Sequence, residues 1–170
     1  MKKIFSIIMV LIMLLAVSAS AAEVGLIDFT TTDMDGNTIT EEIFADYDLT
    51  MVNIWATWCG YCVEEMPELA KLKEMLPENV NLITICDDAS YEPELTKKIL
   101  DETGANFQTL MTTEEMYTQL LAYVYAFPTT FFVDSEGVPV VQPLTGVPSM
   151  ENAADAYYSI IEQILQLMEE

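Results

Sequence analysis

Two cysteines separated by two residues are the part of the sequence best suited to chemistry. Cys59 and Cys62 lie in the stretch WATWCGYCVEEMPEL, residues 55–69, which also carries three glutamates. Such a pair can form a structural disulfide, supply half of a metal site or act as a reversible redox couple. Zinc would need two further ligands, and the chain offers only Cys86 and no histidine. A zinc site is therefore disfavoured.

The elements around the pair favour a redox couple. The apolar run MVNIWA, residues 51–56, predicts a buried strand, and apolar residues at spacings of three and four predict a helix from Cys59 to Leu76. At the start of that helix, free N–H groups and the macrodipole stabilise a thiolate. Cys62 lies one turn later on the same side. We predict that Cys59, at the exposed tip, is the attacking thiolate and that Cys62 resolves the mixed disulfide. A crosslink of such short span constrains the unfolded chain little, which argues against a purely structural role.

Further patterns predict an α/β fold. A strand at Asn81–Cys86 follows the first helix, so the two strands should be parallel and joined by a right-handed crossover. The other expected elements are an N-terminal hairpin turning at Asp35-Gly36, a helix at Glu92–Thr103 stopped by Gly104, a strand at Phe107–Met111, a helix at Glu114–Tyr123 capped by Thr113, a strand at Thr130–Asp134 with its hairpin partner at Val138–Leu144, and a last helix capped by Ser149 that runs to Met168. Pro67 should kink the first helix. The expected architecture is a mixed central sheet flanked by helices on both sides.

The charge of the chain excludes several functions. It has 28 acidic residues against six lysines, no arginine and no histidine, and a net charge of −22. Such a surface repels nucleic acid and anionic lipid, so we expect no nucleic-acid partner. Without histidine, hydrolases of the Ser-His and Cys-His types and most zinc enzymes are excluded. Nothing in the sequence indicates a metal or an organic cofactor, and we expect a monomer.

The N-terminus has the pattern of a secretory signal. Lys2 and Lys3 precede an apolar run at residues 4–17, and Ala19-Ser20-Ala21 supplies small residues for cleavage. We therefore assign residues 1–22 to a signal peptide and residues 23–170 to a single domain. An uncleaved membrane anchor is the alternative. Both place the domain outside the cytoplasm, either secreted or anchored to the membrane. An odd number of cysteines in an exported chain of this size does not resemble a disulfide-stapled scaffold.

Two stretches together resemble a known family. VNIWATWCGYCVEEMPEL, residues 52–69, and AFPTTFFVDSEG, residues 126–137, are similar to the thioredoxin superfamily, and specifically to exported thiol–disulfide oxidoreductases of the TlpA/ResA type. The resemblance extends from about Leu26 to the C-terminus. It implies a thioredoxin-like fold with an N-terminal hairpin extension. It also implies that the cysteine pair exchanges disulfides with exported proteins and receives electrons from a membrane protein of the thiol-relay type.

The resemblance also implies roles for single residues. Pro128 matches the family's cis-proline, which packs against the disulfide, and the backbone of Phe127 would pair with an extended substrate. Glu65 matches an acidic residue that would accept the Cys62 proton. Asn53 stands where cytoplasmic thioredoxins carry a buried aspartate, which leaves Glu65 as the candidate base. The residues expected to contact substrate are Trp58, Gly60, Tyr61, Phe127 and Pro128.

The sequence favours structural rather than catalytic roles for Trp55 and Cys86. Trp55 lies on the predicted strand and should belong to the core, whereas Trp58 should cover the apolar rim of the disulfide. Cys86 ends a predicted parallel strand, on the side of the sheet where sites form. It could sense oxidation or trap a partner, but a buried free cysteine is the favoured interpretation.

The surroundings of the pair favour a reducing couple. Gly60-Tyr61 contains neither the proline of cytoplasmic thioredoxin nor the histidine of strong oxidants, and the nearest lysine in sequence is Lys71. Nearby carboxylates disfavour a thiolate, and a poorly stabilised thiolate makes the couple more reducing. A disulfide reductase is therefore expected. The alternatives are an oxidase that forms disulfides in exported proteins and a redox-inert binding module.

Overall fold

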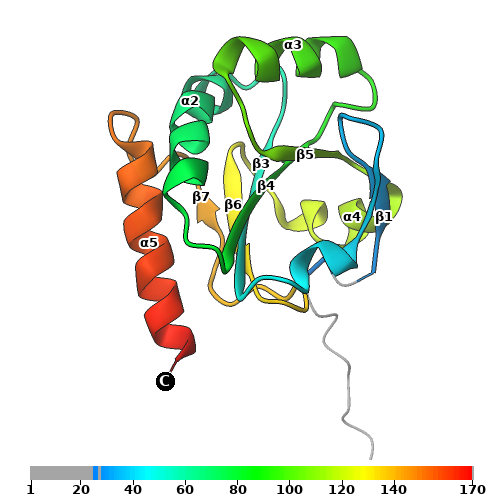
Figure 1. The fold of residues 1–170 in the computed structure, drawn as a ribbon. Coiled ribbons are helices and arrows are strands. Elements are labelled where there is room, and N and C mark those ends of the chain that lie inside the picture. The colour runs from blue at the N-terminus through cyan, green and yellow to red at the C-terminus, as the bar shows by residue number, and fades with distance from the viewer. Residues whose placement is uncertain (1–24, 27, 170) are drawn as a thin grey trace, which may run out of the picture.

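The structure, a computed structural model, describes residues 25, 26 and 28–169 of the chain (Figure 1). The predicted signal peptide lies outside the described residues. None of the described helices has the length and apolar character needed to cross a bilayer.

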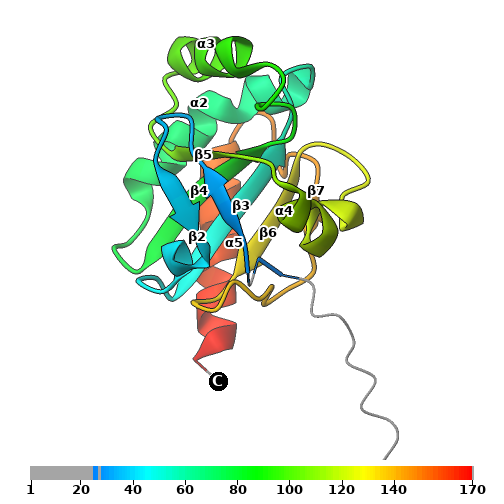
Figure 2. The same cartoon turned by 90° about the vertical axis from the view of Figure 1, so that its right-hand side faces the viewer.

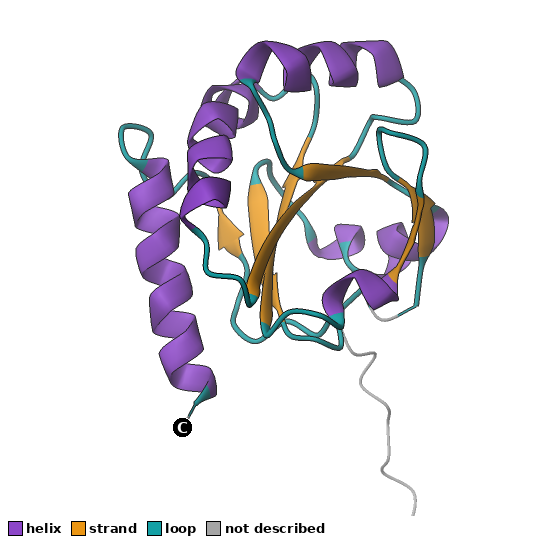
Figure 3. Ribbon diagram, viewed as in Figure 1, coloured by secondary structure: helices purple, strands orange, loops and turns teal. Residues whose placement is uncertain are grey.

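A five-stranded mixed sheet forms the centre of the domain (Figure 3). Its strands are β3 (Leu49–Trp55), β4 (Val80–Cys86), β5 (Gln108–Met111), β6 (Thr129–Val133) and β7 (Leu144–Thr145), in the order β5-β4-β3-β6-β7. Strands β3, β4 and β5 are parallel, whereas β6 is antiparallel to both β3 and β7. The predicted mixed sheet is confirmed. All residues of β3 and β4 are buried, because helices cover both faces of the sheet.

Alternate residues of the central strands enter two separate cores. Met51 and Trp55 of β3 face one core, and Val52 and Ile54 face the other, as the two-residue period of a strand requires. The first core lies under three helices: α2 (Gly60–Met75), α3 (Pro93–Thr103) and α5 (Ala153–Met168). The second lies under η1 (Glu41–Phe44), α4 (Glu114–Gln119) and η2 (Leu121–Tyr123) (Figure 2).

The predicted N-terminal hairpin is present as a separate two-stranded sheet. It pairs β1 (Thr30–Thr32) with β2 (Thr38–Thr40). Gly36 has a φ of +89°, a left-handed value that glycine adopts without the strain of a side chain. An isolated bridge between Asp33 and Leu110 joins the hairpin to the edge strand of the main sheet.

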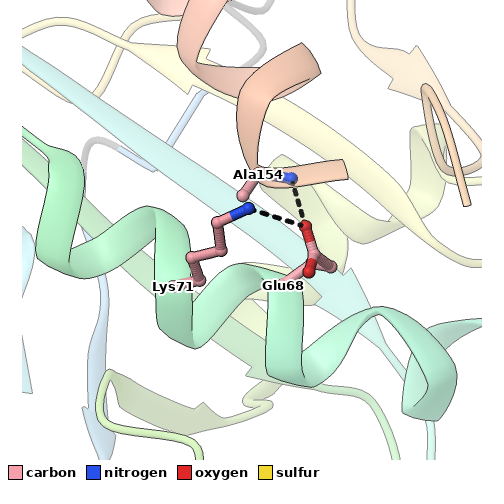
Figure 4. Close-up of polar contacts among 3 residues, drawn as sticks. All are labelled: Glu68, Lys71 and Ala154. Carbon is pink, nitrogen blue, oxygen red and sulfur yellow. Dashed lines mark hydrogen bonds and ion pairs between the residues drawn. The ribbon is translucent and has the colours of Figure 1, made fainter. Parts of the chain in front are cut away.

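The start of the last helix differs from the prediction. Helix α5 begins at Ala153, and Ser149 does not cap it. The side chain of the N-cap residue, Asn152, forms no capping hydrogen bond either. Instead, the Glu68 carboxylate of α2 accepts a hydrogen bond of 3.2 Å from the Ala154 N–H and lies 3.8 Å from the Lys71 ammonium (Figure 4). A free N–H of the first turn is thus satisfied by another helix rather than by a local cap.

The hairpin partner of β6 was also predicted wrongly. Residues 138–144 do not form a continuous strand. The chain makes one bridge between Val133 and Pro139, then leaves the sheet and returns as the two-residue β7. Pro139 and Pro143 have no N–H to donate, which explains why the ladder is interrupted here.

A glycine in the turn after β6 allows us to test the local geometry. Gly137 has a φ of +78°, and a Cβ there would overlap the Leu26 carbonyl oxygen, which belongs to the backbone and cannot move alone. We expect Gly137→Ala to lower the free energy of unfolding by roughly 2–4 kcal/mol. The loss has two sources: the backbone strain of alanine at a left-handed φ, and the clash of its Cβ with the Leu26 carbonyl. Gly146 is the control, since its φ is +84° but no atom lies within 4 Å of the added Cβ. There only the strain of about 1 kcal/mol should remain. Urea denaturation measures both losses, and equal losses would contradict the clash.

Candidate functional site

The two cysteines form a disulfide at the start of α2. The S–S distance is 2.03 Å and the Cα atoms are 5.3 Å apart. Cys59 is the N-cap residue, and its Sγ accepts a hydrogen bond of 3.3 Å from the Cys62 N–H. Cys59 is 7% exposed, whereas Cys62 is fully buried. Of the two cysteines, only Cys59 therefore has any surface open to a partner molecule.

A carboxylate just after the neighbouring strand β4 holds the loop that leads to Cys59. Thr57 donates to Asp88 twice, through its N–H at 2.9 Å and through its hydroxyl at 2.5 Å. Burial acts to raise the pKa of the Asp88 carboxyl, but hydrogen bonds, chiefly those from Thr57, outweigh it and hold the pKa below its ordinary value. The contact between Thr57 and Asp88 was not predicted from the sequence. The available signal was that β3 and β4 are parallel and end side by side, with Trp55 opposite Cys86.

Glu65 lies one turn beyond Cys62 and is only 2% exposed. Its Oε1 accepts a hydrogen bond of 3.0 Å from Asn53 Nδ2, and its Oε2 accepts one of 3.3 Å from the Tyr157 hydroxyl. Burial raises the pKa of the Glu65 carboxyl to about 7, although both hydrogen bonds act in the opposite direction. A group with this pKa can take up or release a proton near neutral pH.

These side chains belong to a buried network of four residues. The Thr130 hydroxyl lies 3.2 Å from Asn53 Nδ2 and 3.2 Å from the Tyr157 hydroxyl. Thr130 therefore contacts both residues that donate hydrogen bonds to Glu65. Burial and the nearby Glu65 carboxylate raise the pKa of the Tyr157 phenol, which keeps its hydroxyl protonated. Tyr157 lies among the buried residues of α5. Its polar hydroxyl on a buried ring was the signal that it needs a partner.

One buried acceptor in this network is left without a partner. Asn53 Oδ1 receives no hydrogen bond from any described residue. When Glu65 is protonated, its own O–H needs an acceptor, and rotation of the Asn53 amide would present Oδ1 to it. The network can therefore accommodate both protonation states of Glu65.

The residues expected to contact substrate surround an exposed rim. The Trp58 side chain is 71% exposed, and its ring packs edge-on against Phe127 at a centroid distance of 5.6 Å. The Phe127–Pro128 peptide bond is cis. Tyr61 is 68% exposed, and a Cβ on Gly60 would meet no atom within 4 Å, so this turn of α2 is open.

Trp55 and Cys86 are buried away from this rim. Trp55 is fully buried and donates a hydrogen bond of 3.3 Å from Nε1 to the Thr84 hydroxyl. Cys86 is buried and free, and its Sγ lies 3.4 Å from Asp88 Oδ1. Burial raises the pKa of the Cys86 thiol to about 12, so it is a thiol at neutral pH. Within residues 25, 26 and 28–169, no group of three or more cysteine, aspartate or glutamate residues is placed to hold a metal ion.

Comparison with known proteins gives matches over most of the domain. Residues 24–141 match the model of the AhpC/TSA family. The thiol:disulfide interchange protein DsbE of Haemophilus influenzae is 34% identical over 104 residues, which cover 61% of this chain and 55% of that protein. The thiol-disulfide oxidoreductase ResA of Bacillus subtilis is 28% identical over 113 residues, 65% of this chain and 60% of ResA. The chain thus spans little more than half the length of these curated relatives.

Solved structures agree on the fold. A thioredoxin-family thiol:disulfide interchange protein from Chlorobium tepidum superposes with a TM-score of 0.66 at 19% identity, covering 83% of this chain and 98% of that one. StoA from Bacillus subtilis superposes with a TM-score of 0.62 at 17% identity, covering 79% and 98%. At such identities the likeness concerns the fold alone. Together with the family match, it shows that the chain belongs to the thioredoxin-like AhpC/TSA family.

Proposed function

We propose that this protein is a thiol–disulfide oxidoreductase that reduces disulfides in exported proteins outside the cytoplasm. The observation that carries the proposal is the Cys59–Cys62 disulfide at the start of α2, with the buried carboxyl of Glu65 one turn below it. The names of the matched relatives support thiol–disulfide exchange, and the secretory pattern of residues 1–22 supports the location.

The reaction follows from the different exposure of the two sulfurs. The Cys59 thiolate of the reduced protein attacks one sulfur of a substrate disulfide, and the other substrate sulfur leaves as a thiolate. Glu65 accepts the proton of the Cys62 thiol, and the Cys62 thiolate attacks Cys59 Sγ in the mixed disulfide. The substrate leaves with both cysteines reduced, and the Cys59–Cys62 disulfide forms. A membrane dithiol protein of the thiol-relay type then returns two electrons to this pair.

The direction towards reduction rests on the charges around Cys59. The described part of the chain has lysines only in the second half of α2 and in α3. Lys71 is 3.8 Å from Glu68 and is thus already paired. Among the described residues, the Cys59 thiolate is therefore stabilised by the helix start and the Cys62 N–H, while Glu64 and Glu65 lie nearby. A thiolate with so little stabilisation belongs to a reducing couple.

The midpoint potential of the Cys59–Cys62 couple tests this direction. The domain is equilibrated with dithiothreitol or glutathione buffers, and free thiols are counted by alkylation and mass measurement. We expect a potential near or below about −250 mV, on the side of thioredoxin. A value near about −120 mV would instead assign the disulfide-forming oxidase. If mild reductant does not reduce the disulfide at all, the protein is a redox-inert binding module.

A further inference from the structure

A groove lined by aromatic rings and one carboxylate lies beside the redox site. It has a volume of about 420 Å³, and its lining includes Trp58, Asp87, Tyr117, Tyr125 and Phe127. We call it the Asp87 groove. Two of its lining residues adjoin the redox site in the sequence, because Trp58 directly precedes Cys59 and Phe127 directly precedes the cis-proline.

The Asp87 carboxylate has no partner among the described residues. Its backbone is fixed, since the Asp87 N–H donates to the Trp55 carbonyl at 2.8 Å and the Thr112 hydroxyl donates to the Asp87 carbonyl at 3.0 Å. The two ion pairs in the described chain, Lys71–Glu68 and Lys98–Glu102, do not involve it. The adjacent Asp88, in contrast, accepts two hydrogen bonds from Thr57. Burial, and after it the Asp88 charge, raise the pKa of the Asp87 carboxyl, which is what an uncompensated half-buried carboxylate shows.

The aromatic rings of the groove add a second attraction for a cation. Trp58, Tyr117 and Tyr125 are 71%, 55% and 91% exposed, so their faces are open to a ligand. The face of an indole or phenol ring attracts ammonium and guanidinium groups. A half-buried carboxylate in a groove lined by such rings matches the long side chain of lysine or arginine, whose aliphatic stem can pack on the rings while its head reaches the carboxylate.

The shape of the surface fits an extended polypeptide. A second groove of about 490 Å³ shares Asp87 and Tyr117 with the first and continues past Tyr91, Thr113 and Glu114. The two grooves form one track with Asp87 and Tyr117 at the junction. A polypeptide that enters at Cys59 can thus extend along this track past both residues.

We propose that the Asp87 groove binds a lysine or arginine side chain located within a few residues of the target cysteine of a substrate polypeptide. This inference rests on the proposed function, because it places the cation beside the disulfide that Cys59 attacks. It agrees with the charge of the chain, which is −22 with no arginine. The groove would therefore select cationic segments among the exported disulfide proteins.

Two matched disulfide peptides test the proposal. They carry the same Cys-x-x-Cys disulfide and differ only by lysine or glutamine next to the first cysteine. The rate constant for their reduction by the reduced protein is followed through tryptophan fluorescence. We expect the lysine peptide to react about tenfold faster, with the advantage lost at high salt. Asp87→Asn should reduce the ratio of the two rates towards one, whereas Asp155→Asn, an equal charge change at an exposed position of α5, should retain it. Equal rates for the wild-type protein, or an unchanged ratio in Asp87→Asn, would overturn the proposal.

A binding measurement separates this proposal from the redox function. The same two peptides with both cysteines replaced by serine cannot react, so their dissociation constants for the oxidised protein report the groove alone. We expect tighter binding of the lysine peptide, and a loss of that preference in Asp87→Asn. If the protein reduces neither disulfide peptide, the proposed function fails; if the serine peptides bind equally, the groove proposal fails.

Discussion

A Cys62→Ser variant is expected to stop after the first exchange and to accumulate a covalent complex with its substrate through Cys59. Cys62 is fully buried and Cys59 is the cysteine of the pair with exposed surface, so the first attack does not need Cys62. Without the resolving thiol, the mixed disulfide cannot be released. Turnover should fall by at least about a thousandfold. Non-reducing electrophoresis and mass measurement identify the complex and its linked cysteine.

Two further variants complete this experiment. Cys59→Ser should form no complex, because it lacks the attacking sulfur. Cys86→Ala should retain turnover, because the Cys86 thiol is buried and burial raises its pKa to about 12. A complex linked through Cys62 or Cys86 would contradict the assignment of Cys59 as the nucleophile.

Replacing Glu65 by glutamine should stabilise the oxidised protein at alkaline pH. The pKa of this carboxyl is about 7 in the folded protein, against its ordinary value of 4.5. The folded state therefore binds the proton more tightly, and its stability falls as the pH rises from 4.5 to 7. Glutamine resembles the protonated acid and can keep the hydrogen bond from Asn53. Above the folded pKa, Glu65→Gln should be more stable by up to about 3 kcal/mol, whereas the two proteins should be alike at acidic pH.

Urea denaturation at pH values on both sides of this window measures the effect. Glu64→Gln is the matched control, because Glu64 is the exposed neighbour on the same helix, and it should leave the pH dependence unchanged. If wild type and Glu65→Gln lose stability in parallel as the pH rises, Glu65 is not the titrating group. The same substitution removes the proposed proton acceptor, so release of the mixed disulfide should slow at neutral pH.

The fold was predictable where neighbouring residues determine it. The apolar period of residues 51–56, the cysteine pair after them and the glycine after α3 each depend on local preferences, and β3, α2 and α3 lie where expected. The interrupted partner of β6 was also visible in principle, because Pro139 and Pro143 fall within the predicted strand.

The contacts that complete the site could not be predicted in the same way. Tyr157 meets Glu65 across 92 positions of sequence, and Thr57 meets Asp88 across 31. No local preference specifies which buried hydroxyl reaches which carboxylate, since that depends on how two distant elements pack. The start of α5 was missed for the same reason, because a carboxylate of α2 acts where a local cap was expected.

The contact between Glu68 and Ala154 has a consequence for how the proton-accepting group is assembled. Glu68 lies three residues after Glu65 on α2, and Ala154 lies three residues before Tyr157 on α5. The two helices therefore contact each other at two levels, Glu65 with Tyr157 and Glu68 with Ala154, which lie about one helical turn apart. A slip of α5 by one residue would move Tyr157 by about 1.5 Å along the helix axis and about 100° around it. The Glu68–Ala154 contact thus fixes the registration of α5 on α2, and the helix that carries the cysteines also aligns the hydroxyl that donates to Glu65, the proposed base.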